Sequence, residues 1–248
     1  MDGVIYRGSR LIPGAGVFIE RLLEKEIPFL FITNASELLP SDLVRRLKGL
    51  GVEGLSEKHF MTCAMVAASF LKSQKPGARV FVVGENGLRN EIEQAGLVLT
   101  DDHPDYVVVG MTKTFNFEIL AKAANLIRNG AHFIGTNPDA VDPVEEGILP
   151  ACGSILAAIE TASGEKPYIV GKPNALMMHT ARKRIGAHSS ETVMIGDRMD
   201  TDILAGLEAG MTTCLVLSGV SDRKTAEHFP YRPNHIFNNV GEIELEKL

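Results

Sequence analysis

Side chains suited to cation and phosphate chemistry lie at four predicted strand ends in this sequence. They are Asp2, Thr33 with Asn34, Lys172, and Asp197 with Asp202. In an open parallel sheet, ligands bind beyond the carboxyl ends of the strands, so we expect these groups to meet. Carboxylate oxygens favour Mg²⁺, which takes one or two carboxylates together with waters and substrate oxygens. An ammonium, a hydroxyl and loop N–H groups can bind a phosphoryl group. The pattern therefore predicts a site for a divalent cation and a phosphate ester.

Taken singly, each of these residues also has an ordinary structural explanation. Asp2 can be a solvated acid in a turn, and Thr33 and Asn34 can form a strand-end turn or a helix cap. Asp197 and Asp202 can cap the following helix, because acids are favourable near a helix N-terminus. A lysine before a proline is often a surface residue. Only the joint pattern favours a site.

Apolar runs alternate with amphipathic segments along the chain, which is typical of a parallel sheet covered by helices. The expected strands are 28–34, 105–111, 131–137, 167–173, 191–197 and 212–219. The expected helices are 16–26, 41–51, 115–131, 151–164, 175–186 and 202–210, with strand, turn and helix in 78–96. The predicted fold class is α/β, with a Rossmann-like parallel-sheet core domain and an inserted α/β cap domain.

Two stretches rich in proline, glycine and lysine mark the predicted domain boundaries. They are SQKPGA (73–78) and GEKPYIVGKP (164–173). Residues 1–75 and 172–248 then form the core domain. Residues 76–171 form the cap, which at 96 residues is large enough for a small domain.

The composition excludes several classes of protein. A net charge of −6 gives no support to binding of nucleic acid or of anionic membranes. No apolar run approaches the roughly 18 residues that span a bilayer, and no secretory leader is visible. Cys63, Cys152 and Cys214 lie far apart, which predicts buried free thiols and a cytoplasmic protein. The oligomeric state stays open.

Several stretches resemble the motifs of the haloacid dehalogenase superfamily. These are MDGV at the start, TNAS (33–36), GKP (171–173) and GDRMDTD (196–202). The cap between the second and third motifs is similar to that of the NagD-type phosphatases, which include 4-nitrophenyl phosphatase and ribonucleotide monophosphatase. TNPDAV (136–141), ILPACGSI (148–155) and LSGV (217–220) also resemble this subfamily.

The resemblance implies a Mg²⁺-dependent phosphatase that acts on small phosphomonoesters through an aspartyl-phosphate. Asp2 matches the general acid/base, whose backbone carbonyl also reaches the metal. Thr33 and Asn34 match the phosphate loop, and Lys172 matches the residue that holds the phosphate and the nucleophile. The metal-binding acids correspond to Asp197 and Asp202.

Substrate choice is assigned to the cap in this interpretation. Our candidates there are Asn137, Asp139 and the stretch 141–148, although a plain surface loop is an equally good explanation. Nucleotides, sugar phosphates, phosphoglycolate and pyridoxal phosphate all remain open as substrates.

The family pattern Asp-x-Asp-Gly matches this sequence with one departure. Asp2 and Gly3 correspond to its last two residues and Met1 to the x, which places the nucleophile immediately before Met1. We expect a start assigned at an internal methionine, an open slot in the sheet where the preceding strand belongs, and almost no activity of the chain as printed. The alternatives are a catalytically impaired relative that binds phosphate esters or metal, and a phosphotransferase or mutase that uses the same intermediate.

Overall fold

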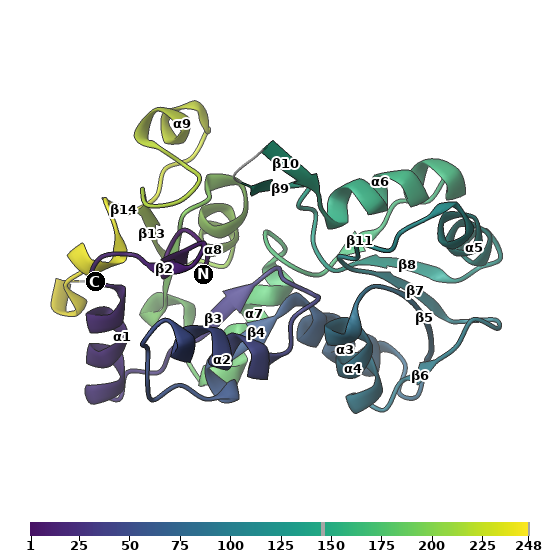
Figure 1. The fold of residues 1–248 in the computed structure, drawn as a ribbon, viewed down its shortest axis with the longest axis horizontal. Helices are drawn as coiled ribbons and strands as arrows, with labels where there is room; N and C mark the ends of the chain where they lie inside the picture. Colours follow the sequence, from purple (N-terminus) through teal and green to yellow (C-terminus); the bar gives the residue numbers. More distant parts are fainter. Residues whose placement is uncertain (145–146, 248) are drawn as a thin grey trace. The chain divides into compact units, whose positions relative to one another are not determined.

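The computed structural model describes residues 1–144 and 147–247, and the chain forms two compact units (Figure 1). The first unit comprises Met1–Ile32, Pro40–Met61 and Lys172–Leu248. The second comprises Thr33–Leu39 and Thr62–Gly171. The sequence predicts a core domain of residues 1–75 and 172–248 and a cap of residues 76–171. This division has the boundary between residues 171 and 172 in common with the two units, and it stays a prediction.

The first unit contains a parallel sheet of three strands. These are β12 (Val193–Gly196), β13 (Thr212–Val216) and β14 (His235–Phe237), with β13 in the middle. Gly196 is paired with Leu215, and Cys214 with His235. The inner strand is almost entirely buried, as an inner strand of a parallel sheet should be. Its neighbour β12 ends at Gly196, directly before Asp197.

Helices and short strands complete this unit. The helices are α1 (Ala15–Glu24), α2 (Pro40–Gly49), α7 (Ala175–Ile185), α8 (Leu204–Glu208) and α9 (Arg223–His228). The short strands are β1 (Tyr6–Arg7), β2 (Arg10–Leu11), β3 (Phe31–Thr33) and β4 (Phe60–Thr62), paired β1 with β2 and β3 with β4. The last residues of β3 and β4, Thr33 and Thr62, are counted with the second unit. Helix α1 buries Phe18, Ile19 and Leu22, whose spacing places them on one face of the helix.

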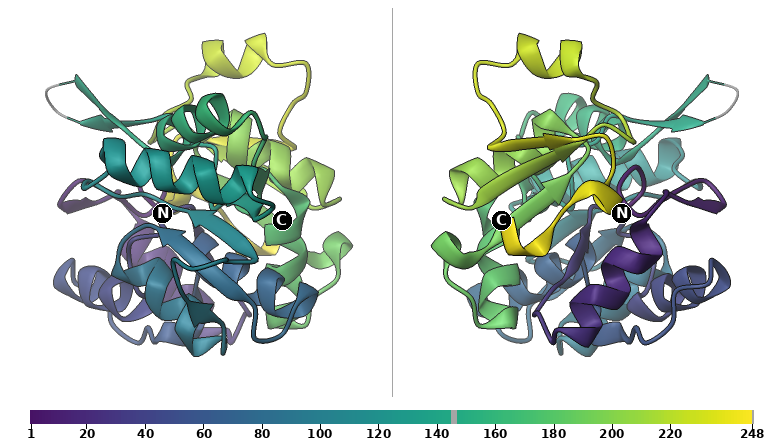
Figure 2. Two further views of the ribbon diagram at one scale, coloured as in Figure 1. Left: turned by 90° about the vertical axis from the view of Figure 1, so that its right-hand side faces the viewer. Right: turned by 90° about the vertical axis from the view of Figure 1, so that its left-hand side faces the viewer.

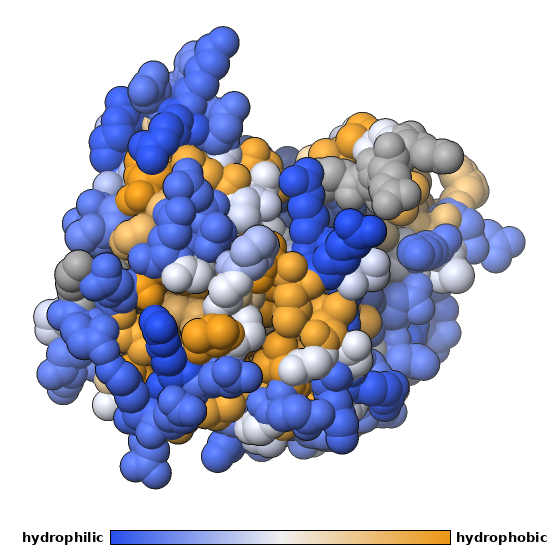
Figure 3. Space-filling model, turned by 60° about the vertical axis from the view of Figure 1, so that its left-hand side comes forward, coloured by the Kyte–Doolittle hydropathy of each residue, from blue (hydrophilic) through white to orange (hydrophobic). Residues whose placement is uncertain are grey.

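A cavity of about 580 Å³ lies inside the first unit. Its lining includes Phe29 and Phe31 on the β3 side, Met194 on β12 and Met178 on α7. Among the described strands, β3 and β12 belong to different sheets. The sequence predicts an open slot in the sheet, and this cavity is a candidate for it. Figure 3, which brings the side with α1 and the C-terminus forward, shows hydrophobic side chains across the middle of that face.

The second unit is built on a parallel five-stranded sheet. In order, its strands are β11 (Tyr168–Ile169), β8 (His132–Gly135), β7 (Tyr106–Val109), β5 (Arg79–Val83) and β6 (Val98–Leu99). The helices are α3 (Cys63–Gln74), α4 (Asn86–Gln94), α5 (Phe117–Arg128) and α6 (Cys152–Ser163). This arrangement confirms the predicted α/β class with a parallel sheet.

Helices cover both faces of this sheet, with α5 and α6 on one side and α3 and α4 on the other (Figures 1 and 2). Ile127 of α5 and Ile159 of α6 pack with Val107 and Val109 of β7. All three cysteines of the chain are free and buried, as predicted.

A two-stranded hairpin, β9 (Val141–Val144) with β10 (Gly147–Pro150), precedes α6. Ile148 and Leu149 are exposed on it, so neither face of the hairpin is fully covered. The candidate stretch 141–148 falls on this hairpin, but its residues 145–146 lie outside the described residues.

Candidate active site

Lys172, Asp197 and Asp202 form a buried polar cluster in the first unit. The ammonium of Lys172 donates a hydrogen bond of 2.5 Å to Oδ1 of Asp202. The other oxygen of Asp202 accepts hydrogen bonds from the backbone N–H groups of Asp197, at 3.1 Å, and Arg198, at 3.2 Å. All three side chains are less than one tenth exposed. The structure thus brings these three predicted residues into one contiguous set of contacts.

A π-helical turn, Met199–Ile203, carries Asp202 back towards the end of β12. The N–H of Ile203 donates to the carbonyl of Arg198, which is the wide hydrogen bond that defines this turn. Such turns occur often at functional sites. The predicted helix 202–210 is shorter in the structure, Leu204–Glu208, because this turn occupies its beginning.

Two glycines allow the carboxylate of Asp197 to sit against the backbone. A Cβ atom added to Gly3 or to Gly219 would overlap Oδ2 of Asp197. The same oxygen accepts a hydrogen bond of 2.9 Å from the N–H of Val220. The carboxylate is therefore fixed by close packing as well as by a hydrogen bond.

Burial raises the pKa of Asp197, and the nearby charge of Asp202 raises it further. Burial also acts to raise the pKa of Asp202, but the charge and the hydrogen bond of Lys172 outweigh it and leave that pKa lowered. The ionised form of Asp197 is thus disfavoured in this cluster.

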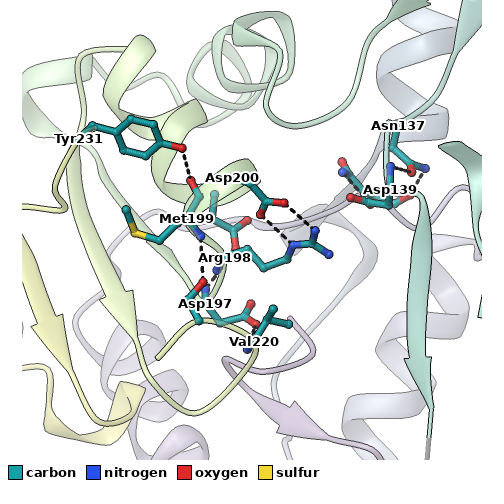
Figure 4. Close-up of polar contacts among 11 residues, drawn as sticks. Asn137, Asp139, Asp197, Arg198, Met199, Asp200, Val220 and Tyr231 are labelled. Atoms are coloured by element: carbon teal, nitrogen blue, oxygen red, sulfur yellow. Dashed lines mark hydrogen bonds and ion pairs between the residues drawn. The ribbon is translucent and has the colours of Figure 1, made fainter. Parts of the chain in front are cut away.

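The loop after β12 is braced by a second set of contacts (Figure 4). Arg198 donates two hydrogen bonds to Asp200, at 3.1 Å from Nε and 2.9 Å from Nη2. Tyr231 donates to the carbonyl of Met199 at 3.1 Å, and the N–H of Met199 donates to the hydroxyl of Ser221 at 3.2 Å. We expect these contacts to hold the backbone that presents Asp197.

The other predicted residues are placed differently. The side chain of Asp2 is exposed, and its backbone forms an isolated bridge with Tyr6. Thr33 and Asn34 belong to the second unit, where the hydroxyl of Thr33 accepts a hydrogen bond from the N–H of Ala35. Asn137 and Asp139 lie in the same unit as Asn34 and contact it.

The sequence analysis did not assign a role to three residues that contact Asp197, its loop or Asn34. Gly219 packs on Asp197, Arg198 braces the loop, and Cys63 donates to the carbonyl of Asn34. LSGV (217–220) and GDRMDTD (196–202) contain the first two, so these motifs carried the signal. The sequence predicts a buried thiol at Cys63, but it does not indicate the contact of this thiol with Asn34.

The described cluster offers a divalent cation two carboxylates. Within residues 1–144 and 147–247, no group of three or more His, Cys, Asp or Glu side chains is arranged to hold a metal ion. Mg²⁺ commonly takes only one or two carboxylates and completes its shell with water and substrate oxygens. Because the ionised form of Asp197 is disfavoured by burial and by Asp202, a cation beside both would stabilise it. The residues present therefore fit Mg²⁺.

None of the helices described here has both the length and the apolar character needed to cross a membrane.

Known proteins resemble this chain over nearly all of its length. Residues 1–98 match the family model of haloacid dehalogenase-like hydrolases, and residues 169–243 match a further model of HAD-like hydrolases. Dihydroxyacetone phosphatase of Corynebacterium glutamicum (strain R) is 47% identical over 243 residues, which are 98% of this chain and 88% of that protein. Ribonucleotide monophosphatase NagD of Escherichia coli (strain K12) is 42% identical over 245 residues, 99% of this chain and 96% of that protein.

Solved structures agree with these relatives. NagD from the E. coli K-12 strain has a TM-score of 0.93 at 41% identity, covering 98% of this chain and 96% of that one. The 4-nitrophenylphosphatase of Thermotoga maritima has a TM-score of 0.93 at 37% identity, with coverages of 98% and 93%. The chain therefore belongs to the haloacid dehalogenase-like hydrolases, in their NagD-like subfamily, and is a phosphomonoesterase of that family.

Proposed function

We propose that this protein hydrolyses small phosphomonoesters with the help of Mg²⁺. The observation that carries the proposal is the buried contact between Lys172 and Asp202, with Asp197 beside them at the end of β12. Two buried acids and one buried ammonium beyond a strand end are costly for folding. They are well suited to a dication and a phosphoryl group, which together restore the balance of charge.

Each residue has a distinct task in this proposal. Asp197 and Asp202 hold Mg²⁺, which would supply charge stabilisation to the phosphoryl oxygens. Lys172 neutralises phosphoryl charge, and the hydrogen bond to Asp202 fixes the direction of its ammonium. Thr33 and Asn34 bind phosphoryl oxygens, and Asp2 acts as general acid/base. The attacking group that the family resemblance implies is an aspartate, which would form an aspartyl-phosphate.

The proposed substrate class is supported by the relatives, which are named dihydroxyacetone phosphatase, ribonucleotide monophosphatase NagD and acid sugar phosphatase. These names indicate small phosphorylated metabolites as the substrates of those relatives. We infer a substrate of this class for the present protein, which acts in the cytoplasm without nucleic acid or membrane partners.

A phosphatase assay on two proteins tests the proposal. One is the chain as printed, and the other continues upstream in the same reading frame. Both are assayed with and without Mg²⁺ on dihydroxyacetone phosphate, ribonucleoside monophosphates, sugar phosphates and 4-nitrophenyl phosphate.

We expect Mg²⁺-dependent release of phosphate by the longer protein and almost none by the printed chain. Equal turnover by the two proteins would contradict the position of the nucleophile. Activity that is unchanged after removal of divalent cations would contradict the role of Mg²⁺. A protein that binds Mg²⁺ and inorganic phosphate but turns over no ester in either form would be the catalytically impaired relative.

A further inference from the structure

Asn34 is held from three directions within the second unit. Its side-chain Nδ2 donates a hydrogen bond of 3.0 Å to Oδ2 of Asp139. Its backbone carbonyl accepts one of 2.8 Å from Nδ2 of Asn137 and one of 2.9 Å from the thiol of Cys63. These partners lie far from Asn34 in the sequence, so the contacts are made by the fold.

The bond to Asp139 also decides which way the amide of Asn34 faces. An ionised carboxylate only accepts hydrogen bonds, so the nitrogen end of the amide must point towards it and the oxygen end away. Oδ1 of Asn34 accordingly lies on the side of Gly171, where an added Cβ atom would come within 2.8 Å of it. The orientation of the amide is thereby fixed.

The loop that supplies these partners is itself held by hydrogen bonds. The N–H of Asp139 donates to Oδ1 of Asn137 at 3.1 Å, as Figure 4 shows, and its carbonyl accepts from the N–H of Gly153 at 2.8 Å. The hydroxyl of Ser154 donates to the carbonyl of Ala140 at 2.7 Å. A loop braced in this way can hold Asn34 in one place.

The burial of Asn137 argues against direct contact with a substrate. Its residue surface is only 3% exposed, and its amide nitrogen is occupied by the carbonyl of Asn34. Asp139 is half-buried, with one carboxylate oxygen directed at Asn34. The sequence suggested that both residues contact the substrate, whereas their contacts in the structure point inwards to Asn34.

We propose that Asp139 and Asn137 are positioning residues, which set the orientation of Asn34 for binding of the substrate's phosphoryl group. The inference rests on the proposed function, in which Asn34 belongs to the phosphate loop. Misplacing a substrate-binding group by about 1 Å can cost up to a hundredfold in rate. Because every substrate carries the same phosphoryl group, loss of this positioning affects all substrates alike.

The test uses Asp139→Ala, Asp139→Asn, Asn34→Ala and the double variant Asn34→Ala/Asp139→Ala. The matched control is Ser154→Ala, which removes a hydrogen bond to the same loop without touching Asn34. Kinetics are measured in the protein found active above, on 4-nitrophenyl phosphate and a ribonucleoside monophosphate. Thermal unfolding of each variant shows whether it is folded.

We expect Asp139→Ala to lower kcat/KM by roughly tenfold to a hundredfold, by the same factor on both substrates. Asp139→Asn keeps an oxygen acceptor and retains most of the activity, and Ser154→Ala stays close to wild type. The double variant is no worse than Asn34→Ala, because Asp139 acts through Asn34. A loss that differs between the two leaving groups, or losses that multiply in the double variant, would mean that Asp139 acts on the substrate itself. If Ser154→Ala lowered kcat/KM as much as Asp139→Ala, the loss would come from a general loosening of the loop, and the positioning role of Asp139 would be wrong.

A readout that does not need activity separates this inference from the proposed function. The side-chain amide resonances of Asn34 are followed by NMR, with inorganic phosphate as the probe. We expect phosphate to shift them in the wild type, and we expect Asp139→Ala to move and broaden them even without phosphate. If no ester is hydrolysed but these resonances respond as described, the proposed function fails and the positioning of Asn34 stands. Resonances unchanged by Asp139→Ala would overturn the positioning role.

Discussion

The ammonium of Lys172 lies 2.5 Å from Oδ1 of Asp202, and both side chains are almost completely buried. A buried ion pair is held together by mutual attraction, but each partner has lost its contacts with water. Removing one partner leaves an uncompensated charge inside the protein. The pair is therefore a point where catalytic and structural roles can be separated.

Lys172→Met should lower the free energy of unfolding by about 3–5 kcal/mol, because Asp202 is left as a buried, unpaired carboxylate. The double variant Lys172→Met/Asp202→Asn is neutral at both positions, and its amide oxygen can still accept from the N–H groups of Asp197 and Arg198. We expect it to recover most of the lost stability and none of the activity. Urea unfolding and phosphatase assays on the same samples check both expectations. A double variant as unstable as Lys172→Met would show that the ionic contact is not the source of the loss.

Asp197→Asn should separate stability from metal binding. Burial and the charge of Asp202 raise the pKa of Asp197, so its ionised form weighs against folding at neutral pH. Asparagine removes the charge and keeps an oxygen for the N–H of Val220. We expect an unchanged or higher Tm without metal, no rise in Tm on addition of Mg²⁺, and loss of activity.

The matched control for this variant is Asp200→Asn. Asp200 lies three residues after Asp197 and pairs with Arg198. The side chain of Asp200 is about half exposed. Its Mg²⁺-induced rise in Tm should equal that of the wild type. A rise in Asp197→Asn as large as in the wild type would rule out Asp197 as a ligand.

The strand ends explain how far the site can be predicted from the sequence. Lys172 and Asp197 each follow a recognisable apolar run, and the sequence-based expectation is that residues beyond the strand ends of one parallel sheet gather on the same edge. In the structure, Lys172 follows β11 and Asp197 follows β12, and these two strands belong to different sheets, so the shared edge of one sheet does not account for the cluster. The long helices were also predictable, since Phe117–Arg128 and Cys152–Ser163 lie within a few residues of their expected bounds.

Features that depend on distant parts of the chain could not be predicted in this way. The bond between Asn34 and Asp139 joins residues 105 positions apart, and no local pattern encodes it. The hairpin of β9 and β10 contains Pro143 and exposed apolar residues, so it shows neither the composition nor the alternation of a half-buried strand. The packing of Gly219 on Asp197 likewise arises only when β12 and β13 are paired side by side.

Gly219→Ala should impair the site with little loss of helical or strand structure. The added methyl group would overlap the carboxylate of Asp197, which is already fixed by the N–H of Val220, so the carboxylate must move. We expect a fall in kcat of up to about a hundredfold together with weaker binding of Mg²⁺. Gly49→Ala is the control, because Gly49 ends α2 with open space around it. An equal effect of the two substitutions on kcat would show that the contact with Asp197 is unimportant.

Glu37 should give the second unit a measurable dependence on pH. Burial raises its pKa above the ordinary value of 4.5, and the nearby charges of Asp142 and Glu85 act in the same direction. Between 4.5 and the raised value, the folded protein binds more protons than the unfolded chain, so stability falls as the pH rises through this interval. Below 4.5 the carboxyl group is mostly protonated in both states and contributes little difference.

Glu37→Gln removes this titration and keeps the size of the side chain. We expect it to raise Tm relative to the wild type at neutral pH, with the difference shrinking towards zero as the pH falls below 4.5. Thermal unfolding across this range checks the prediction, with Glu93→Gln, an exposed glutamate on α4, as the control. A Tm difference for Glu37→Gln that is the same at acid and neutral pH would place its origin in packing, because a buried charge must act only where it is ionised.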